Sequence, residues 1–595
     1  MRHLLMLVPI VAIAQNTVST PQFTADVDGF LKKEIAAHIA DIKTIPQERV
    51  STALTTGEYS WGTFLRSVAV NAALSGEKTI AGRDVAKFLG QVGLVEAREG
   101  GKAFSQMYAA LGLRHFGTDL KTNALWQSLT PAEQAEWRSL LDPARFYDSK
   151  ARHVINLPEN YFGVAARVAT MDYQMGIITD RAFVDDLLDL AAAQFLKGAN
   201  YSDDALPAGR FDRYSQEYER YVYEAAENVG RQDLMAKLEP SLKTQLRLWW
   251  KLVDPDGYGF PWGRSLGDIG YMDTMEIVGF TAAHPQFRPA PLPVLASAYY
   301  AAWKSLMKDY LPARHLLNVF GFGHGHFSYI SLDREWQQTT GFYGKIANAE
   351  ILFKKAMREE NVASFASKID LPVVRGFESF RKGDRPAGVW IVRQPGLQFA
   401  LPITTGTKPG IADYLPSPHG LIDFSAPVEQ VAPALTPFVE LSDGRVIVAG
   451  DGADEIDPAA DGLGLRVVWR RWVSIGGKPA EFVAPGLTSE VTWRIENGGL
   501  TRSETITAAN RVDIRRLSVM FPTTSSTAHA DGDYILDHVQ INATGVGTPT
   551  IHATGDSALG KGNLGPIPII LEWQLRDLKI HPGQPFRWSL RIRPL

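Results

Sequence analysis

The chain of 595 residues contains no cysteine. Disulfide bonds, thiolate catalysis and cysteine-ligated metal sites are therefore excluded. An excess of charge of either sign is also missing, since 61 Lys and Arg oppose 65 Asp and Glu for a formal net charge of −4. That balance gives no reason to expect nucleic acid or an anionic membrane surface as a partner. No segment after the N-terminus is apolar over the length of a membrane span.

Several catalytic signatures are missing as well. The sequence has no P-loop, no Rossmann fingerprint after a predicted strand, no G-x-S-x-G elbow and no H-E-x-x-H motif. Nucleotide-binding and serine-hydrolase functions therefore have no support.

Apolar and aromatic residues, in contrast, are plentiful. Hydrophobic residues make up 45% of the chain, with 14 Trp, 19 Tyr and 28 Phe. A chain of this length and composition is expected to bury a large core in two or three domains. Aromatic rings also serve as stacking platforms for sugars, although large cores use them too.

The N-terminus has the pattern of an export signal. Arg2 and His3 precede an apolar run from Leu4 to Ala14, which ends in a small-x-small pattern before Gln15. We expect residues 1–15 to be a secretory signal peptide and the protein to be secreted or periplasmic.

The next part of the chain, to about residue 360, has helical periodicity almost throughout. The predicted helices are too numerous for a four-helix bundle. An (α/α) toroid or an α-solenoid would bury their apolar faces. No fixed-period repeat is present, which disfavours the solenoid. Helices are predicted at 22–43, 61–76, 103–113, 131–142, 161–177, 181–198, 214–229, 231–252, 269–283, 291–309 and 346–360.

After about residue 360, short alternating and β-branched segments separated by Gly, Asn and Asp turns indicate an antiparallel β-sandwich. The predicted fold class is α+β multidomain, with an N-terminal (α/α) toroid and a C-terminal β-sandwich. The predicted boundaries are a signal peptide at 1–15, a toroid catalytic domain at 16–360, a linker at 361–387 and the sandwich at 388–595.

A Gly- and aromatic-rich loop leads into the helix predicted at 269–283. It places Trp262, Arg264 and Ser265 at the N-terminus of that helix and Asp268 beside its first turn. Arginine binds carboxylates through two nitrogens and helix amides favour negative charge, so this loop suits an anionic ring such as a sugar acid. The alternative is a capped helix with a salt-bridged arginine. Asp268 either complements the helix dipole or acts as a general acid.

Asn160 and Tyr161 stand at the entry of another predicted helix. Asn160 either caps that helix or neutralises a substrate carboxylate through its amide. We predict that both residues contact substrate.

A third group opens the helix predicted at 214–229. A tyrosine beside an arginine can have a lowered pKa and serve as acid or base, so Tyr214 next to Arg213 is a catalytic candidate. Arg213 itself is predicted to bind substrate. Asp212 and Glu217 are the alternative, as the carboxylate pair of a glycosidase. The structural alternative is a solvated, salt-bridged helix start.

A glycine-rich stretch carries His324 and His326, followed by Trp336. Glycine lets backbone approach a ligand, and the histidines suit acid–base catalysis. Two ligands at this spacing are a weak metal signal, so we predict no cofactor, with a divalent cation possible. Trp262 and Trp336 are predicted to stack on sugar rings.

These motifs resemble heparinase II/III-type and alginate-lyase-type toroid proteins. They also resemble a related toroid family of formerly unknown function, some members of which are β-glucuronidases. The resemblance rests on Asn160-Tyr161, on Phe211-Asp212-Arg213-Tyr214 and on Pro261-Trp262-Gly263-Arg264-Ser265-Leu266, and it covers roughly residues 20–360. It implies a cleft acting on uronate-containing glycans. There Asn160 and Arg264 neutralise the carboxylate, and Tyr214, His324 or His326 transfers protons. Tyr161 departs from the lyase pattern, which often has His or Trp after the Asn.

The leading hypothesis is an exported enzyme that degrades uronate-containing polysaccharide or oligosaccharide by β-elimination, a polysaccharide lyase. A glycoside hydrolase that releases uronic acid, with Asp212, Glu217 or Asp268 as acid and base, is the first alternative. A non-catalytic protein that binds acidic glycan is the second.

Overall fold

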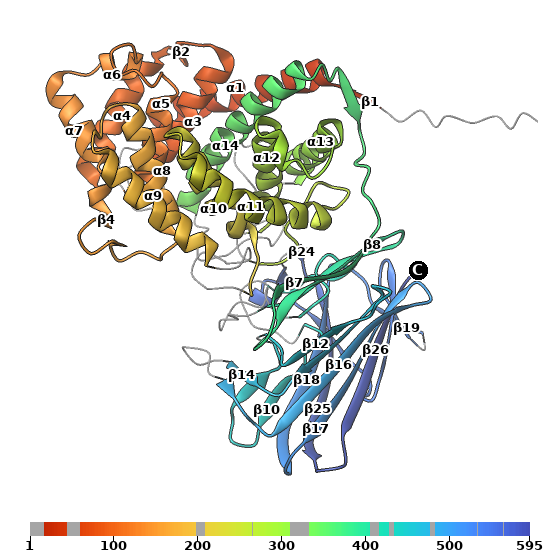
Figure 1. Ribbon diagram of the computed structural model, residues 1–595. Helices are drawn as coiled ribbons and strands as arrows, with labels where there is room; N and C mark the ends of the chain where they lie inside the picture. The colour runs from red at the N-terminus through yellow and green to blue at the C-terminus, as the bar shows by residue number, and fades with distance from the viewer. Residues whose placement is uncertain are drawn as a thin grey trace, which may run out of the picture.

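The computed structural model describes residues 17–44, 60–100, 102–197, 209–263, 266–309, 332–404, 416–427, 434–450, 452–475, 482–531, 533–562 and 564–595. A helical body precedes a β-rich body along the chain (Figure 1). The predicted fold class is confirmed. The predicted signal peptide lies outside the described residues. None of the helices described is long and apolar enough to pass through a bilayer.

The helical body is a ring with an inner and an outer layer. Along the described chain, each inner helix packs against the next, and α14 packs against α3 to close the ring. Helices α10 and α12 meet through their side chains. The inner helices are α3 (Ser60–Ser75), α5 (Ala103–Arg114), α8 (Tyr161–Gln174), α10 (Arg213–Asn228), α12 (Asp268–Ala283) and α14 (Leu332–Glu359).

Outer helices return the chain between inner ones, so the inner helices run parallel. Their N-terminal ends gather at one end of the ring, which we call the N-terminal pole. The outer helices are α1 (Thr20–Thr44), α4 (Val85–Glu99), α7 (Pro131–Leu141), α9 (Arg181–Leu196), α11 (Gln232–Leu252) and α13 (Leu292–Asp309), and the short α6 (Ala124–Gln127) precedes α7.

Glycines allow the inner helices to approach closely. A Cβ atom on Gly344 of α14 would lie 2.8 Å from the Cα of Ser67 on α3. A Cβ on Gly62 of α3 would lie 1.9 Å from the backbone oxygen of Ser105 on α5. Real Cβ contacts are not this short, so larger residues at these positions would force the ring open.

Three helices differ from the sequence prediction, among them the short α6, which was not predicted. The helix predicted at 346–360 begins at Leu332, because its first turns carry buried polar residues such as Thr339 and Thr340 in place of an apolar stripe. Helix α4 was not predicted, since Gly90 and Gly93 interrupt its pattern. Gly93 is required there because a Cβ would lie 1.9 Å from the Trp137 ring.

The β-rich body is a sandwich of two sheets whose strand pairs are all antiparallel. The first sheet has the order β15-β14-β11-β10-β18-β25-β22, and the second has the order β12-β13-β16-β17-β26-β21-β20-β19. The first comprises β10 (Phe438–Leu441), β11 (Val446–Val448), β14 (Trp472–Ile475), β15 (Phe482–Val483), β18 (Val512–Thr523), β22 (Thr550–Ala553) and β25 (Ile569–Ile580). The second comprises β12 (Glu455–Pro458), β13 (Gly464–Trp469), β16 (Leu487–Glu496), β17 (Gly499–Ala508), β19 (His529–Asp531), β20 (Asp533–Ile535), β21 (Val539–Thr544) and β26 (Phe586–Pro594).

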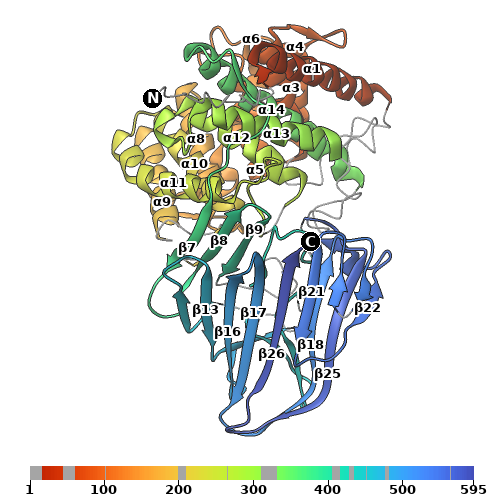
Figure 2. The same cartoon turned by 90° about the vertical axis from the view of Figure 1, so that its right-hand side faces the viewer.

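A third sheet lies between the ring and the sandwich (Figure 2). It consists of β7 (Val374–Arg381), β8 (Ala387–Gln394) and β9 (Leu397–Ile403). Its apolar side chains, including Phe380 and Val389, form one buried cluster with Phe211 and Trp262 of the ring. The segment predicted as a linker, 361–387, therefore contains strand β7 and part of the contact between the two bodies.

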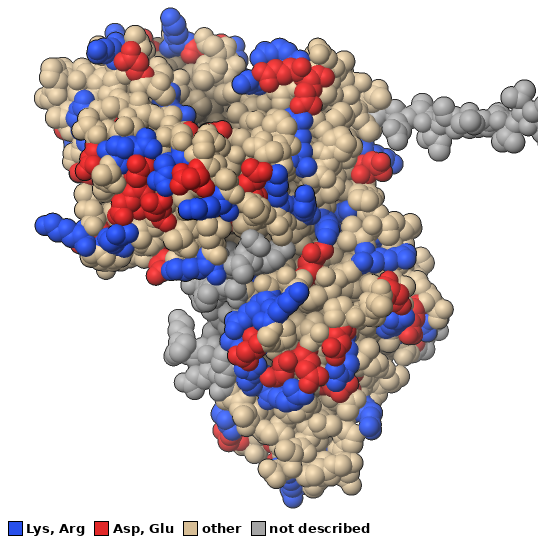
Figure 3. Space-filling view, in the orientation of Figure 1, with Lys and Arg blue, Asp and Glu red and all other residues tan. Residues whose placement is uncertain are grey.

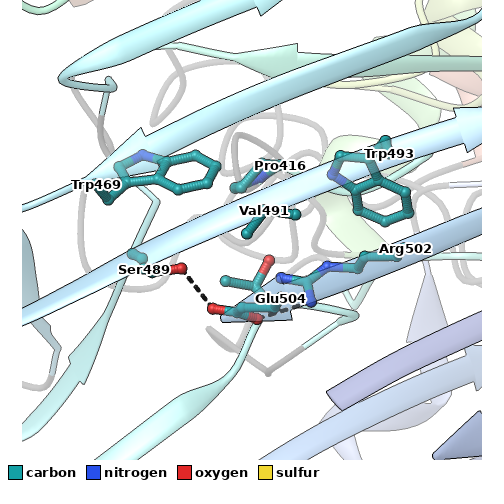
Figure 4. Close-up of a pocket in the computed structure, with 9 residues that line it drawn as sticks. Pro416, Trp469, Ser489, Val491, Trp493, Arg502 and Glu504 are labelled. Atoms are coloured by element: carbon teal, nitrogen blue, oxygen red, sulfur yellow. Dashed lines mark hydrogen bonds and ion pairs between the residues drawn. The ribbon is translucent and has the colours of Figure 1, made fainter. Parts of the chain in front are cut away.

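The sandwich core contains a buried ion pair beside two tryptophans (Figure 4). Arg502 contacts Glu504 at 2.7 Å, and Trp588 donates its indole N–H to the same carboxylate at 2.9 Å. The Arg502 guanidinium also lies over the Trp588 ring at 4.4 Å. Because the charges cancel and the carboxylate is bonded within the core, this cluster is a structural element of the sandwich.

The first and last parts of the ring are joined by a short sheet. Strand β1 (Thr17–Ser19) pairs antiparallel with β6 (Ser364–Ala366), with Thr17 opposite Ala366. The chain therefore leaves the ring close to the place where it enters.

Candidate functional site

The N-terminal pole brings the starts of the inner helices together on the side that faces the third sheet. Each helix N-terminus carries about half a positive charge, so a ring of parallel helices creates a positive potential at this end. Elsewhere, on the face of the molecule shown in Figure 3, Lys and Arg lie close to Asp and Glu. Within the described fold, the pole is therefore the place where the dipoles of several helices together favour the binding of an anion.

Asn160 lies at the pole directly before α8 and does not cap that helix. Its backbone is helical, with φ −60° and ψ −21°, and its side chain makes no capping hydrogen bond. The residue is 2% exposed, and its Oδ1 has no hydrogen-bond partner among the described residues. A buried amide oxygen without a partner is costly. The structure therefore does not support the capping alternative for Asn160.

Tyr214 occupies the same level of the ring as Asn160. Helices α8 and α10 run parallel, and Gly163 packs against the backbone of Tyr218. A Cβ atom added to Gly163 would lie 3.5 Å from the backbone oxygen of Tyr218. Asn160 and Tyr214 each precede that contact by one helical turn. Aromatic contacts continue across the pole, because the Tyr214 ring stacks on Tyr218 at 5.9 Å and Phe104 meets Tyr161 at 5.2 Å.

Arg213 is buried and its charge is fully used. Its guanidinium binds Asp273 through two nitrogens, one of them at 3.1 Å from Oδ1, and contacts Glu217 at 3.1 Å. Its guanidinium carbon lies 4.3 Å from the centre of the Tyr214 ring. Arg213 therefore ties α10 to α12 beneath Tyr214, whereas the sequence predicted that it binds substrate directly.

The two carboxylates considered as a glycosidase pair are engaged in other contacts. Asp212 caps α10, accepting a hydrogen bond from the backbone N–H of Tyr214 at 2.9 Å. Glu217 contacts Arg213 and Lys345 and accepts a hydrogen bond from Tyr221 at 2.8 Å. Burial alone would raise the pKa of Glu217, but Arg213 and Lys345 hold it well below its usual range. The start of α10 is therefore salt-bridged, as the structural alternative predicted. It is buried, however, whereas that alternative predicted a solvated helix start.

Beneath the pole, carboxylates and cations alternate along the axis of the ring. Glu217, Asp273 and Glu276 lie close enough to share a metal ion. However, the Lys345 ammonium stands 3.2 Å from Glu217 and 3.0 Å from Glu276, and Arg213 bridges Glu217 to Asp273. Two cations of the chain thus offset most of the charge of these three carboxylates.

Asp268 is the first residue of α12 and is 2% exposed. Burial raises the pKa of Asp268 to about 7, which backbone hydrogen bonds and Arg213 only partly oppose. Its Oδ2 has no hydrogen-bond partner among the described residues. A carboxyl group that is partly protonated near neutral pH is suited to donate a proton.

The two tryptophans predicted as sugar platforms both pack inside the fold. Trp262 is 2% exposed and donates its indole N–H to the backbone oxygen of Phe211 at 3.0 Å. The Trp336 ring lies between His38 at 5.1 Å and Phe64 at 5.8 Å, stacked on both. Trp262 is enclosed by the cluster that it shares with the third sheet, and Trp336 is half-buried.

Of the remaining predicted residues, one lies at the pole and four lie outside the described residues. Tyr161 is buried in the aromatic contact with Phe104. Arg264, Ser265, His324 and His326 lie outside the described residues.

Sequence reasoning missed the basic residues of the ring axis. Arg66 and Arg167 lie within predicted helices and Lys345 directly precedes one, and none of the three was named as a candidate. A single charge enclosed by apolar neighbours, as in Phe342-Tyr343-Gly344-Lys345-Ile346-Ala347, was the available signal. The sequence also gave no sign of His419, which is buried beside β9 in a cavity of about 350 Å³ that Pro261 also lines.

No protein-family model matches the chain, and no curated protein does either. Among solved structures the chain is similar to heparinase III, with 9% identity and a TM-score of 0.48 over 89% of this chain and 75% of that one. It is also similar to chondroitinase AC lyase, with 9% identity and a TM-score of 0.43 over 96% and 83%. Heparan sulfate lyase HepC from Pedobacter heparinus matches with 10% identity and a TM-score of 0.26 over 86% and 76%. These neighbours include the heparinase type that the sequence motifs resemble. At these identities the chemistry of the site rests on its own residues.

Proposed function

We propose that the protein is an exported polysaccharide lyase that cleaves a uronate-containing glycan by β-elimination. The observation that carries the proposal is the buried amide of Asn160, which is not used as a cap and lies at the pole level with Tyr214. A ring of helix N-termini around it favours an anionic group.

The roles follow from the chemistry of elimination. The Asn160 amide donates to the uronate carboxylate, and Arg264 pairs with it. Neutralising the carboxylate makes the C5 proton more acidic. Tyr214, or a histidine at 324 or 326, removes that proton, and a second group protonates the oxygen that leaves C4. The C4–O bond breaks as the C4–C5 double bond forms. No metal is needed for these steps, since the cationic and amide groups bind the carboxylate.

One observation favours a hydrolase as the second candidate. Asp268 is buried at the same pole with its pKa raised to about 7, as a general acid requires. Hydrolysis also needs a second carboxylate within about 5–9.5 Å across the cleft. Asp212 is a helix cap and Glu217 is bound by two cations, so neither is free for that role.

The test is to incubate the mature protein with a panel of uronate polysaccharides and to record ultraviolet absorbance and reducing ends in parallel. A lyase produces the absorbance of a conjugated C4–C5 double bond together with new reducing ends. New reducing ends without that absorbance would show hydrolysis instead. Binding without either signal would support the non-catalytic alternative.

Variants then assign the residues. Replacing Tyr214 by Phe is expected to lower kcat by about 100-fold or more, because proton transfer contributes 10²–10⁴-fold. Replacing Asn160 by Asp should also abolish turnover, because it places a negative charge against the uronate. Tyr300, a half-buried tyrosine on outer helix α13, supplies the control variant Y300F, which should keep full activity.

A further inference from the structure

A small cavity lies on the axis of the ring, below the layer formed by Glu217, Lys345 and Glu276. Its free volume is about 20 Å³, and its lining comes from all the inner helices. The charged groups of the lining are three arginines and two carboxylates, namely Arg66, Arg167, Arg220, Glu224 and Glu276. None of the described residues predicted to bind substrate lines this cavity.

Two buried arginines of this cavity lack a counter-charge. Arg66 is 6% exposed and Arg220 is 5% exposed. Among the described residues, neither has a carboxylate oxygen within the 4.0 Å of an ion pair. Arg220 donates from Nε to Gln216 at 2.6 Å, and its Nη2 is buried with no hydrogen-bond partner. The contact described for Arg66 is with the Tyr108 ring, at 5.3 Å.

The other charged groups nearby are already paired. Arg167 binds Glu224, and Glu276 binds Lys345 at 3.0 Å. Glu276 attracts Arg66 and Arg220 only at longer range. Burial raises the pKa of Glu276, but Lys345 and these two arginines together lower it. The basic side chains around the cavity therefore exceed the carboxylates.

Arginine does not lose its proton in proteins, so a buried guanidinium without a partner is not relieved by a change of protonation. An uncompensated buried charge is strongly destabilising. A bound anion would supply the missing charge and accept the free N–H of Arg220. The amide of Asn348, which has no hydrogen bond within the described chain, offers a further donor.

We propose that this axial cavity binds one chloride ion, held by Arg66 and Arg220. The size of the cavity decides the kind of anion. A free volume of about 20 Å³ suits a particle the size of a water molecule or a halide. A phosphate or sulfate, or the carboxylate of a sugar, would require the walls to move.

The first test is crystallographic and uses the wild-type protein. Crystals soaked in sodium bromide should show an anomalous bromide peak between Arg66 and Arg220. A cavity that contains only water under those conditions would overturn the proposal.

The second test measures thermal unfolding at equal ionic strength in sodium chloride and in sodium gluconate. Chloride should raise the Tm of the wild type by about 2–4 °C, because a ligand that binds only the folded state stabilises it. R66M and R220M should lose this difference. Arg247 is exposed on α11, and its variant R247M should keep it.

A third set of variants keeps the test usable if the methionine variants do not fold. R66K and R220K keep the charge, and they should retain part of the response to chloride even if the methionine variants do not fold. Equal Tm values for the wild type in chloride and gluconate would refute the site. A rise with inorganic phosphate but not with chloride would refute its assignment to a halide.

Discussion

Arg213 lies with its guanidinium carbon 4.3 Å from the centre of the Tyr214 ring while two of its nitrogens bind Asp273. One residue thus fixes the position of its neighbour at the pole and joins helix α10 to helix α12. Phe280 of α12 also contacts Tyr223 and Arg220 of α10 further along, so this ion pair joins the N-terminal parts of the two helices.

We expect R213M to destabilise the fold by about 3–5 kcal/mol, since it leaves Asp273 and Glu217 as buried charges with one fewer partner. Urea unfolding measures the change. Arg98, which binds Glu136 on the surface, provides the control: R98M should unfold like the wild type. Equal losses in the two variants would contradict a special role for the buried pair.

Lys345 is expected to be equally important along the axis. K345M removes the cation between Glu217 and Glu276 and should cost about 3–5 kcal/mol. The double variant K345M/E276Q should recover about 1–3 kcal/mol of that loss, because it removes one of the two carboxylates left without a partner. A double-mutant cycle by chemical unfolding gives the coupling energy. A coupling near zero would show that Glu276 finds another partner.

Asp268 should make stability depend on pH. Burial raises its pKa from an ordinary 3.8 to about 7, so the folded protein binds this proton more tightly than the unfolded chain does. The resulting stabilisation is complete below pH 3.8 and is lost as the pH rises through 7. D268N should therefore be more stable than the wild type at pH 8, by about 2 kcal/mol, and this advantage should disappear near pH 4. Unfolding curves at both pH values test it.

Trp262 is expected to act through packing. W262A should destabilise the fold by about 3–5 kcal/mol, because it empties the cluster shared with Phe211 and Phe380. W262F fills most of that space and loses only the hydrogen bond to Phe211, so its cost should be about 1 kcal/mol. Binding of glycan to W262F, measured by calorimetry, should equal that of the wild type. A large loss of affinity in W262F would restore the prediction that this ring stacks on sugar.

Much of the fold was predictable because most inner and outer helices have apolar stripes and clear ends. Helix α7, for example, begins after Thr130, whose side chain forms a capping box with Glu133. The periodicity rule fails where the buried face is polar. The first turns of α14 bury Thr339 and Thr340, so their sequence does not have the pattern of a core helix.

The site was predictable in part for the same reason. Asn160 and Tyr214 were identified because they stand at helix starts, where sequence patterns are informative. The roles of Arg213 and Trp262 were not, because they depend on partners such as Asp273 and Phe211 that lie far away in the chain. Sequence spacing gives the level of a side chain along its helix, but the neighbouring helices decide whether it faces a ligand or an ion pair.

The pairing of Thr17–Ser19 with Ser364–Ala366 has a consequence for biosynthesis. On the ribosome, the first strand of the ring emerges hundreds of residues before its partner, and α3 likewise waits for α14. The helical body therefore completes its fold only after residue 366 has left the exit tunnel.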